Sequence, residues 1–321
     1  MGFIIKPAAA DIKPCYVIHS KISIVGDAAL DAFCAGNGTN GSVNNPYIIQ
    51  NYIINANGIG NPIYISNINK HLIITNCFFT GSGSNAINVD AGVKIVSCGN
   101  ITLANCSIES NAWYGVVLQN SRNILVDNNT ITNNAVSGIY LYNADFSNIT
   151  KNRVISNSNT GIVVFNGASN NSIHDNYVKS NAINGITIGL STNGNKIFDN
   201  RVEYNNNNGI DIGNGSYNVV YGNLIYSNGF CGIYLTSESR NNEIFQNTIE
   251  YNARECILDA GLNNIIHDNT CIKSPPFDYT LIVVLIVSVA GVILVITVIL
   301  VIKRKKRRVG YSGEVHYHDK Y

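Results

Sequence analysis

Acidic, aromatic and arginine side chains recur at matching positions along the middle of the chain. Asp175 and Asp199 are separated by 24 positions, and Arg201 follows the second of them closely. Carboxylates beside a guanidinium could hold a glycan, or could bind a Ca²⁺ ion that bridges to an acidic sugar. Asp175, Asp199 and Arg201 are therefore the catalytic candidates, provided that the fold brings them together. Asp268 takes the position of Asp175 and Asp199 in a later repeat. Arg153 and Tyr177 take the position of Arg201 in earlier repeats.

A column of mostly aromatic residues directly precedes these carboxylates. Its members are Thr150, His174, Phe198, Tyr221, Phe245 and His267. Exposed rings at strand spacing would form a strip about 25 Å long, on which sugars could stack. The five ring-bearing members, from His174 to His267, are thus ligand-binding candidates. Cross-strand stacking of such rings also stabilises sheets without any ligand, and Asp before a bend is ordinary turn chemistry.

Catalysis requires more than the presence of these groups. Glycoside hydrolysis needs two carboxylates that face one cleft at a defined separation. Asp175 and Asp199 are one repeat apart, which resembles a like-charge pair more than an acid and a base. Lys179 and Glu203 occupy neighbouring repeats on an outward column, and we interpret them as a surface ion pair. The residues therefore favour a binding protein over an enzyme.

A sequence repeat determines how these groups are positioned. A glycine followed by an apolar-x-apolar triplet recurs at intervals of 23 or 24 residues, and such a period indicates a stack of identical units. In one unit Ile186 and Ile188 alternate with Thr187, as in a strand with one buried face. Three short strands per repeat, joined by Asn and Gly bends, predict one turn, or rung, of a parallel β-helix. The glycines are Gly92, Gly115, Gly138, Gly161, Gly185, Gly209 and Gly232.

Aligning the repeats yields columns. The predicted inward slot holds Ile48, Ile74, Leu103, Val126, Ile149, Ile173, Ile197, Val220, Ile244 and Ile266. Three residues later come Asn51, Cys77, Cys106, Asn129, Asn152, Asn176, Asn200, Asn223, Asn247 and Asn269. Asn tolerates a left-handed bend, and its amide can bond the backbone and the Asn of the next rung. A second ladder is predicted through Asn134, Asn157, Asn181, Asn205, Asn228 and Asn252.

These rungs resemble the repeats of the NosD-like and pectin-lyase-like superfamily. The segment Asn45–Asn51 resembles the opening of membrane-anchored repeat proteins on archaeal cell surfaces. The resemblance covers Lys21 to Lys273 and implies a right-handed parallel β-helix. It implies no single activity, because the superfamily contains lyases, hydrolases, binders and structural proteins.

The N-terminal part is expected to cap the stack. Residues 1–20 form a leading segment, and Ile22 and Ile24 begin the first strand of a β-helix over 21–273. A loop is expected over 26–45, with a short capping helix over 27–33. About ten rungs at about 4.8 Å give a rod of roughly 45–50 Å.

The C-terminal part differs abruptly in composition. Residues 280–302 are apolar and uncharged, and as a helix they would span about 34 Å, enough to cross a bilayer. A linker over 274–279 precedes them, and a basic tail over 303–321 follows. The positive-inside rule places the tail in the cytoplasm and the β-helix outside the cell membrane.

Charge and the N-terminus bear on compartment and partners. The net charge is +1, and six cations in the tail account for more than all of it, so the rod has no basic face for nucleic acid. Residues 1–14 show no signal peptide. We favour a leader that the recorded start omits; the alternative is a tail-anchored protein with a cytosolic rod.

The chain has eight cysteines. Cys77 and Cys106 share the ladder slot in neighbouring rungs, where they could be small buried residues or a disulfide. The NosD resemblance adds copper, with His71 as a third ligand, but no close Cys/His motif supports a metal site, and no cofactor is expected. Cys231 and Cys256 are expected near one another at a rung start, and Cys271 is expected to pack in the slot of Ile249.

The sequence therefore predicts an all-β, right-handed parallel β-helix with one C-terminal transmembrane helix. We interpret it as a cell-surface module that binds glycan or a protein partner through an exposed sheet face. An enzyme acting on surface polysaccharide, as a lyase or hydrolase, and a purely structural envelope rod are the alternatives.

Overall fold

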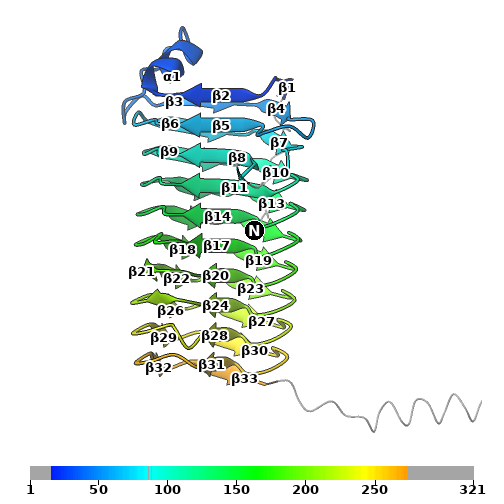
Figure 1. Cartoon of the computed structure of the whole chain (residues 1–321), viewed down its shortest axis with the longest axis vertical. Coiled ribbons are helices and arrows are strands. Elements are labelled where there is room, and N and C mark those ends of the chain that lie inside the picture. Colours follow the sequence, from blue (N-terminus) through cyan, green and yellow to red (C-terminus); the bar gives the residue numbers. More distant parts are fainter. Residues whose placement is uncertain (1–15, 86, 88, 274–321) are drawn as a thin grey trace, which may run out of the picture. The chain divides into compact units, whose positions relative to one another are not determined.

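A computed structural model describes residues 16–273 except 86 and 88. The strands of this region repeat in a fixed order and stack into three long parallel sheets (Figure 1). Each rung gives one strand to each sheet, so sequence neighbours lie on different sheets and strands one rung apart pair with each other. The stack is a parallel β-helix, as predicted.

Sheet A has eleven strands. They are β1 (Val17–Ile18), β4 (Tyr52–Asn55), β7 (Phe78–Thr80), β10 (Ser107–Glu109), β13 (Thr130–Thr132), β16 (Arg153–Ile155), β19 (Tyr177–Lys179), β23 (Arg201–Glu203), β27 (Leu224–Tyr226), β30 (Thr248–Glu250) and β33 (Thr270–Ile272). Because β1 pairs with β4, sheet A begins a few residues before the predicted start of the β-helix at Lys21.

Sheets B and C have ten strands each. Sheet B contains β2 (Ile22–Val25), β5 (Ile63–Ser66), β8 (Ala91–Val96), β11 (Tyr114–Gln119), β14 (Ile139–Tyr142), β17 (Ile162–Phe165), β20 (Ile186–Ile188), β24 (Ile210–Ile212), β28 (Ile233–Leu235) and β31 (Ile257–Asp259). Sheet C contains β3 (Tyr47–Gln50), β6 (Leu72–Thr75), β9 (Ile101–Ala104), β12 (Leu125–Asp127), β15 (Asn148–Thr150), β18 (Ser172–His174), β22 (Lys196–Phe198), β26 (Val219–Tyr221), β29 (Glu243–Phe245) and β32 (Ile265–His267). A small extra pair joins β21 (Thr192–Asn193) to β25 (Gly215–Ser216).

The predicted asparagine ladders run along the interior of the stack. Asn176 donates its Nδ2 group to Asn200 Oδ1 at 3.0 Å and to the Ile149 carbonyl at 2.8 Å. The left-handed backbone, however, belongs to the residue before the ladder position, as at Asp175 with φ 54°. Asn51, which was predicted for the ladder, is itself such a bend residue with φ 63°. This bend turns the next side chain inward, where the amide satisfies backbone groups that the corner leaves unpaired. A third ladder, not predicted, runs through Asn171, Asn195, Asn218, Asn242 and Asn264.

The repeating glycines are explained by close packing at a corner. A Cβ atom on Gly161 would lie 2.6 Å from Val178 Cγ1 and 2.7 Å from the carbonyl oxygen of Gly185 in the next rung. Side chains do not fit at such distances, so the period of the sequence reflects the approach of one rung to the next.

The predicted inward column is misaligned at its first member. Ile49, which is 1% exposed, pairs with Ile74 in the inward slot, whereas Ile48 is 37% exposed and pairs with Ile73. The alignment was wrong by one residue there, and such a slip moves a strand's side chains to the opposite face.

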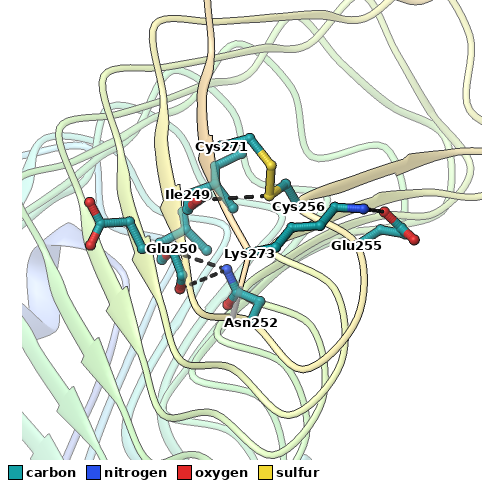
Figure 2. Close-up of a disulfide and its surroundings, with 8 residues drawn as sticks. Ile249, Glu250, Asn252, Glu255, Cys256, Cys271 and Lys273 are labelled. Atoms are coloured by element: carbon teal, nitrogen blue, oxygen red, sulfur yellow. Dashed lines mark hydrogen bonds and ion pairs between the residues drawn. A yellow bond between two sulfur atoms is a disulfide. The ribbon is translucent and has the colours of Figure 1, made fainter. Parts of the chain in front are cut away.

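The two ends of the described stack are closed in different ways. Helix α1 (Asp27–Phe33), drawn in blue in Figure 1, lies at the N-terminal end, in the range predicted for a cap, and buries Leu30. At the other end Cys256 and Cys271 form a disulfide with a Cα–Cα distance of 5.9 Å (Figure 2). Cys256 follows Gly232 in the glycine column, and Cys271 pairs with Ile249.

This disulfide corrects the prediction that packing alone explains Cys271. Cys231, which was expected near Cys256, is a buried free thiol. The disulfide ties sheet A to the corner that opens sheet B, and it closes a loop with a sequence separation of 15. It therefore restrains a last rung whose strands are mostly exposed.

Nothing in the described part of the chain is a helix long and apolar enough to cross a membrane. The segment 280–302, where that helix was predicted, lies outside the described residues. The contacts of the chain divide it between Lys273 and Ser274.

Candidate functional site

The predicted acidic and basic candidates meet in a shallow depression of about 570 Å³. It follows the corner where the chain passes from sheet C to sheet A, after β18 and β22. We call this depression the groove. Its lining residues are Arg153, Asp175, Asn176, Tyr177, Asp199 and Arg201.

Two arginines flank an aromatic ring on one wall of the groove. Tyr177 pairs with Arg153 on one neighbouring strand and with Arg201 on the other. The Cζ atoms of these arginines lie 5.1 and 5.6 Å from the centre of the Tyr177 ring. Cations at this distance from an aromatic ring are attracted to it. The ring thus holds two guanidinium groups about two rungs apart, or roughly 10 Å at strand spacing.

A buried carboxylate supports this wall from behind. Glu203 is 1% exposed and accepts a hydrogen bond from the Tyr177 hydroxyl at 2.6 Å. It also pairs with Arg201 Nε at 2.6 Å and Lys179 Nζ at 3.1 Å. Burial pushes the pKa of Glu203 up, but the hydrogen bonds from Tyr177, Arg201 and Lys179 together hold it below its usual value. The Lys179–Glu203 ion pair exists, but its carboxylate is not at the surface as predicted, because these three side chains enclose it.

The two aspartates that also line the groove are exposed and are held differently. Asp175 Oδ2 lies 2.8 Å from His174 Nδ1. The Asp199 carboxylate lies against Gly222 of the next rung, in the space that a Cβ atom there would need. Both aspartates take the left-handed conformation, with φ of 54° and 52°. The corner therefore projects one carboxylate per rung along the groove.

The aromatic column forms a continuous stack. The ring centres from His174 through Phe198, Tyr221 and Phe245 to His267 lie 4.6, 5.0, 5.2 and 5.3 Å apart. Their planes differ by only 2° to 10°. Each inner ring therefore covers the faces of its neighbours, and the stack offers ring edges to solvent.

The two ends of this column add hydrogen bonds. Thr150 is buried, and its hydroxyl oxygen lies 3.2 Å from His174 Nδ1. His267 contacts Asp268 and Glu243, whose hydrogen bonds raise its pKa. Asp268 is therefore an ion-pair partner at the end of the stack, and it does not line the groove.

Among the described residues, no group of three or more His, Cys, Asp and Glu side chains is arranged to hold a metal ion. Cys77 and Cys106, the pair considered for a disulfide or for copper with His71, are buried free thiols. Burial and the neighbouring Cys77 raise the pKa of Cys106 well above its usual value. The backbone N–H of Cys106 donates a hydrogen bond to Asn129 Oδ1. Cys106 is therefore a small buried residue that precedes the asparagines of the ladder.

Sequence reasoning identified most groove residues and missed Glu203 as their support. The available signal was the Tyr177-x-Lys179 strand opposite the Arg201-x-Glu203 strand. In register, these strands place three donors around a single carboxylate.

The comparisons with known proteins agree with this architecture. The model of the right-handed β-helix region matches residues 37–198, and that of the periplasmic copper-binding protein NosD matches residues 163–271. No curated protein matches the chain.

Several solved structures share the fold. The periplasmic alginate epimerase AlgG is 15% identical with a TM-score of 0.54, covering 66% of this chain and 61% of its own. The A-module of Azotobacter vinelandii mannuronan C-5 epimerase AlgE6 is 13% identical with a TM-score of 0.53, covering 81% and 89%. The tailspike protein 2 domain of bacteriophage CBA120 is 9% identical with a TM-score of 0.52, covering 71% and 39%. The first of the two models spans about half of the sequence, and the chain belongs to the right-handed β-helix family, with NosD-like repeats.

Proposed function

We propose that this chain is a cell-surface β-helix module that binds an acidic glycan in the groove. The observation that carries the proposal is the arrangement of Arg153 and Arg201 around Tyr177, with Asp175 and Asp199 along the same depression. Guanidinium groups bond carboxylates or sulfates in planar, paired geometry. Aspartate carboxylates accept hydrogen bonds from sugar hydroxyls, so both chemistries of an acidic polysaccharide are provided.

The groove is a better binding surface than the aromatic stack beside it. The rings from His174 to His267 cover one another's faces, and the CH groups of a sugar pack on faces, not on edges. Arg201 is already oriented by its Nε bond to Glu203, which lowers the entropy lost when a ligand binds. The names of two fold neighbours, an alginate epimerase and a mannuronan epimerase, add support from related architectures.

Calorimetry with oligouronates tests the proposal. Arg153→Gln removes a guanidinium that has no bond to Glu203, and we expect it to weaken binding about fivefold to tenfold. Added salt should weaken binding by the wild type as well, because the contacts are exposed ion pairs. Arg240→Gln removes an exposed arginine outside the groove and is the matched control. Equal affinity of the wild type and Arg153→Gln would place the bound glycan outside the groove. No binding at all would leave a protein partner or a structural rod as the function.

We further propose that residues 280–302 anchor the module, with the β-helix outside and the tail over 303–321 in the cytoplasm. The Cys256–Cys271 disulfide supports this placement, since such bonds persist in oxidising compartments. Protease treatment of intact cells tests it, with blots for the β-helix and for the tail. Cleavage of the β-helix alone is expected, and full protection would place it in the cytosol.

A second function, chemical modification of the bound glycan, is favoured by two carboxylates beside Arg201 in one depression. Asp199→Asn separates the two functions, because a binder would keep most of its affinity and an enzyme would lose turnover. Chromatography of the polysaccharide after incubation with each protein provides the measurement.

A further inference from the structure

A pocket of about 290 Å³ on sheet B is lined by seven residues, four of which carry aromatic rings. We call it the aromatic cradle. It is built by β11, β14 and the corners before β8 and β11, whereas the groove follows the corner between sheets C and A. The two sites share no residue, so the inference below stands apart from the proposed function. The cradle is lined by Val89, Trp113, Tyr114, Val117, Gln119, Tyr140 and Tyr142.

The floor of the cradle is an apolar side chain on the outer face of the sheet. Val117 lies between Val116 and Leu118, which point into the core, so its own side chain points outward. It is nevertheless fully buried, because the surrounding rings cover it. Tyr140 pairs with Val117 on the next strand, and its ring stacks on that of Tyr114 with centres 4.9 Å apart. These side chains therefore form a small second layer on the sheet.

Apart from the stacked pair of Tyr114 and Tyr140, which differ by 16°, the rings of the cradle lean at different angles, unlike those of the aromatic stack. Trp113 meets Tyr114 edge-on at 79°, and Tyr142 is tilted by 41° from Tyr140. Rings that are not parallel cannot cover one another completely, so faces remain available to a ligand. A ring face offers the negative surface to which the CH groups of a sugar are attracted.

The described part of the lining contains polar groups but no charged ones. None of the seven described lining residues carries a formal charge, while Gln119 and the phenols can donate and accept hydrogen bonds. Burial raises the pKa of Tyr114, and burial together with Tyr114 and Tyr142 raises that of Tyr140 to about 12. These two phenols therefore stay neutral. The charged Lys94 pairs with Val117 on the neighbouring strand but is not among the lining residues. An ionic ligand would therefore lose hydration with no opposite charge in the described lining to replace it.

We propose that the aromatic cradle binds one neutral pyranose unit of a glycan. Its volume of about 290 Å³ lies just below the range of about 300–1,000 Å³ for pockets of drug-sized ligands, which suits a single ring. The ring faces would hold the apolar side of the sugar, and Gln119 with the tyrosine hydroxyls would bond its hydroxyl groups. The cradle thus selects a neutral sugar, where the groove selects an acidic one.

The chain provides its own probe for this site. Trp113 is the single tryptophan, so the intrinsic emission of the full chain reports directly on the cradle. We would titrate the protein with cellohexaose, mannohexaose and chitohexaose. A saturable shift or quench with at least one of them is expected. Tyr142→Ala, which removes one ring, should weaken the binding of that sugar about tenfold. Arg153→Gln should leave the affinity for that sugar unchanged.

Tyr234→Ala is the matched control, because Tyr234 is a half-buried tyrosine on the outer face of the same sheet, away from the cradle. Unchanged emission with every neutral sugar would overturn the proposal, whatever the stability of the variants. A response only to an oligouronate or to a proline-rich peptide would also overturn it. So would an equal loss of affinity in Tyr142→Ala and Tyr234→Ala, since that loss would not come from the cradle.

Discussion

Replacing Asn176 by alanine tests whether the asparagine ladders hold the rungs together. The Nδ2 group of Asn176 donates to the carbonyls of Ile149 and His174 at 2.8 and 2.9 Å. It also donates to Asn200 Oδ1 at 3.0 Å. The Oδ1 atom accepts from the backbone N–H and the Nδ2 of Asn152 at 2.9 and 3.0 Å. One side chain therefore joins three consecutive rungs.

The cost of this substitution comes mostly from one orphaned group. Alanine leaves the backbone N–H of Asn152 buried without its acceptor, which costs about 1–3 kcal/mol. The other partners lose less, because Asn152 Nδ2 still donates to the carbonyls of Val126 and Thr150. Asn200 Oδ1 likewise still accepts from the backbone N–H of Asn176. Adding the net value of the remaining lost bonds, we expect a loss of about 3–4 kcal/mol in the free energy of unfolding.

Urea denaturation followed by circular dichroism measures this loss. Asn176→Asp is nearly isosteric and keeps the acceptor, but it places a carboxylate oxygen where Nδ2 faces three acceptors. It should therefore destabilise at least as much as alanine. Asn206→Ala alters an exposed asparagine and should change the free energy of unfolding by less than about 0.5 kcal/mol. A cost below about 1 kcal/mol for Asn176→Ala, or an Asp variant as stable as the wild type, would refute the reasoning.

Four other substitutions test the packing, the chain end and the groove. Gly161→Ala forces a Cβ atom into the next rung and should lower the free energy of unfolding by about 1–3 kcal/mol in the same denaturation assay. Cys256→Ser removes the restraint on the last rung, for which the loop size predicts about 3 kcal/mol; hydrogen exchange at Cys271 and its neighbours should rise, while central rungs stay protected. Phe198→Ala removes two stacked contacts and should lower the melting temperature without weakening oligouronate binding. Glu203→Gln should cost about 1–2 kcal/mol near neutral pH, less than a fully buried pair, because its cationic partners are partly exposed.

The pH dependence of the Glu203→Gln cost follows from the sign of its shift. The pKa of Glu203 is lower in the folded protein than its usual value. The carboxylate therefore stabilises the fold fully above the unfolded pKa of about 4.3, and that contribution is lost as the pH falls through the lower folded pKa. Denaturation of both proteins between pH 6 and about pH 3 should show the difference in stability shrinking. A difference that grows towards acid would contradict the assigned ion pairs.

The period of the sequence was sufficient to predict which residues lie in the interior and most of those that line the groove. Asn176 and Asn200 could be assigned to one ladder, because an inward slot repeats wherever rungs of equal length stack. The same alignment placed Asp175 and Asp199 on one corner. The first rung broke the rule at Ile48, because the long insertion before it removes the fixed spacing on which the alignment depends.

Contacts that do not repeat could not be predicted in this way. Glu203 occupies an outward position on its strand, and only the side chains of its neighbours make it buried. The Cys256–Cys271 disulfide joins the corner before sheet B to a strand of sheet A, so no column contains both of its ends. Its signal was indirect: Cys256 replaces the glycine that the repeat requires after Gly232, in the last rung of the described residues.

A solenoid separates the demands of folding from those of binding. Inward positions must repeat, since each must fit the rung above and the rung below it, and Asn176 or Gly161 has little freedom to change. Outward positions meet only their neighbours on the sheet, so they can differ from rung to rung. The groove and the aromatic cradle both lie where outward residues depart from the repeat: Tyr177 between two arginines, and Trp113 as the single tryptophan. In such a chain, local departures on the outer face indicate function more reliably than the repeat itself.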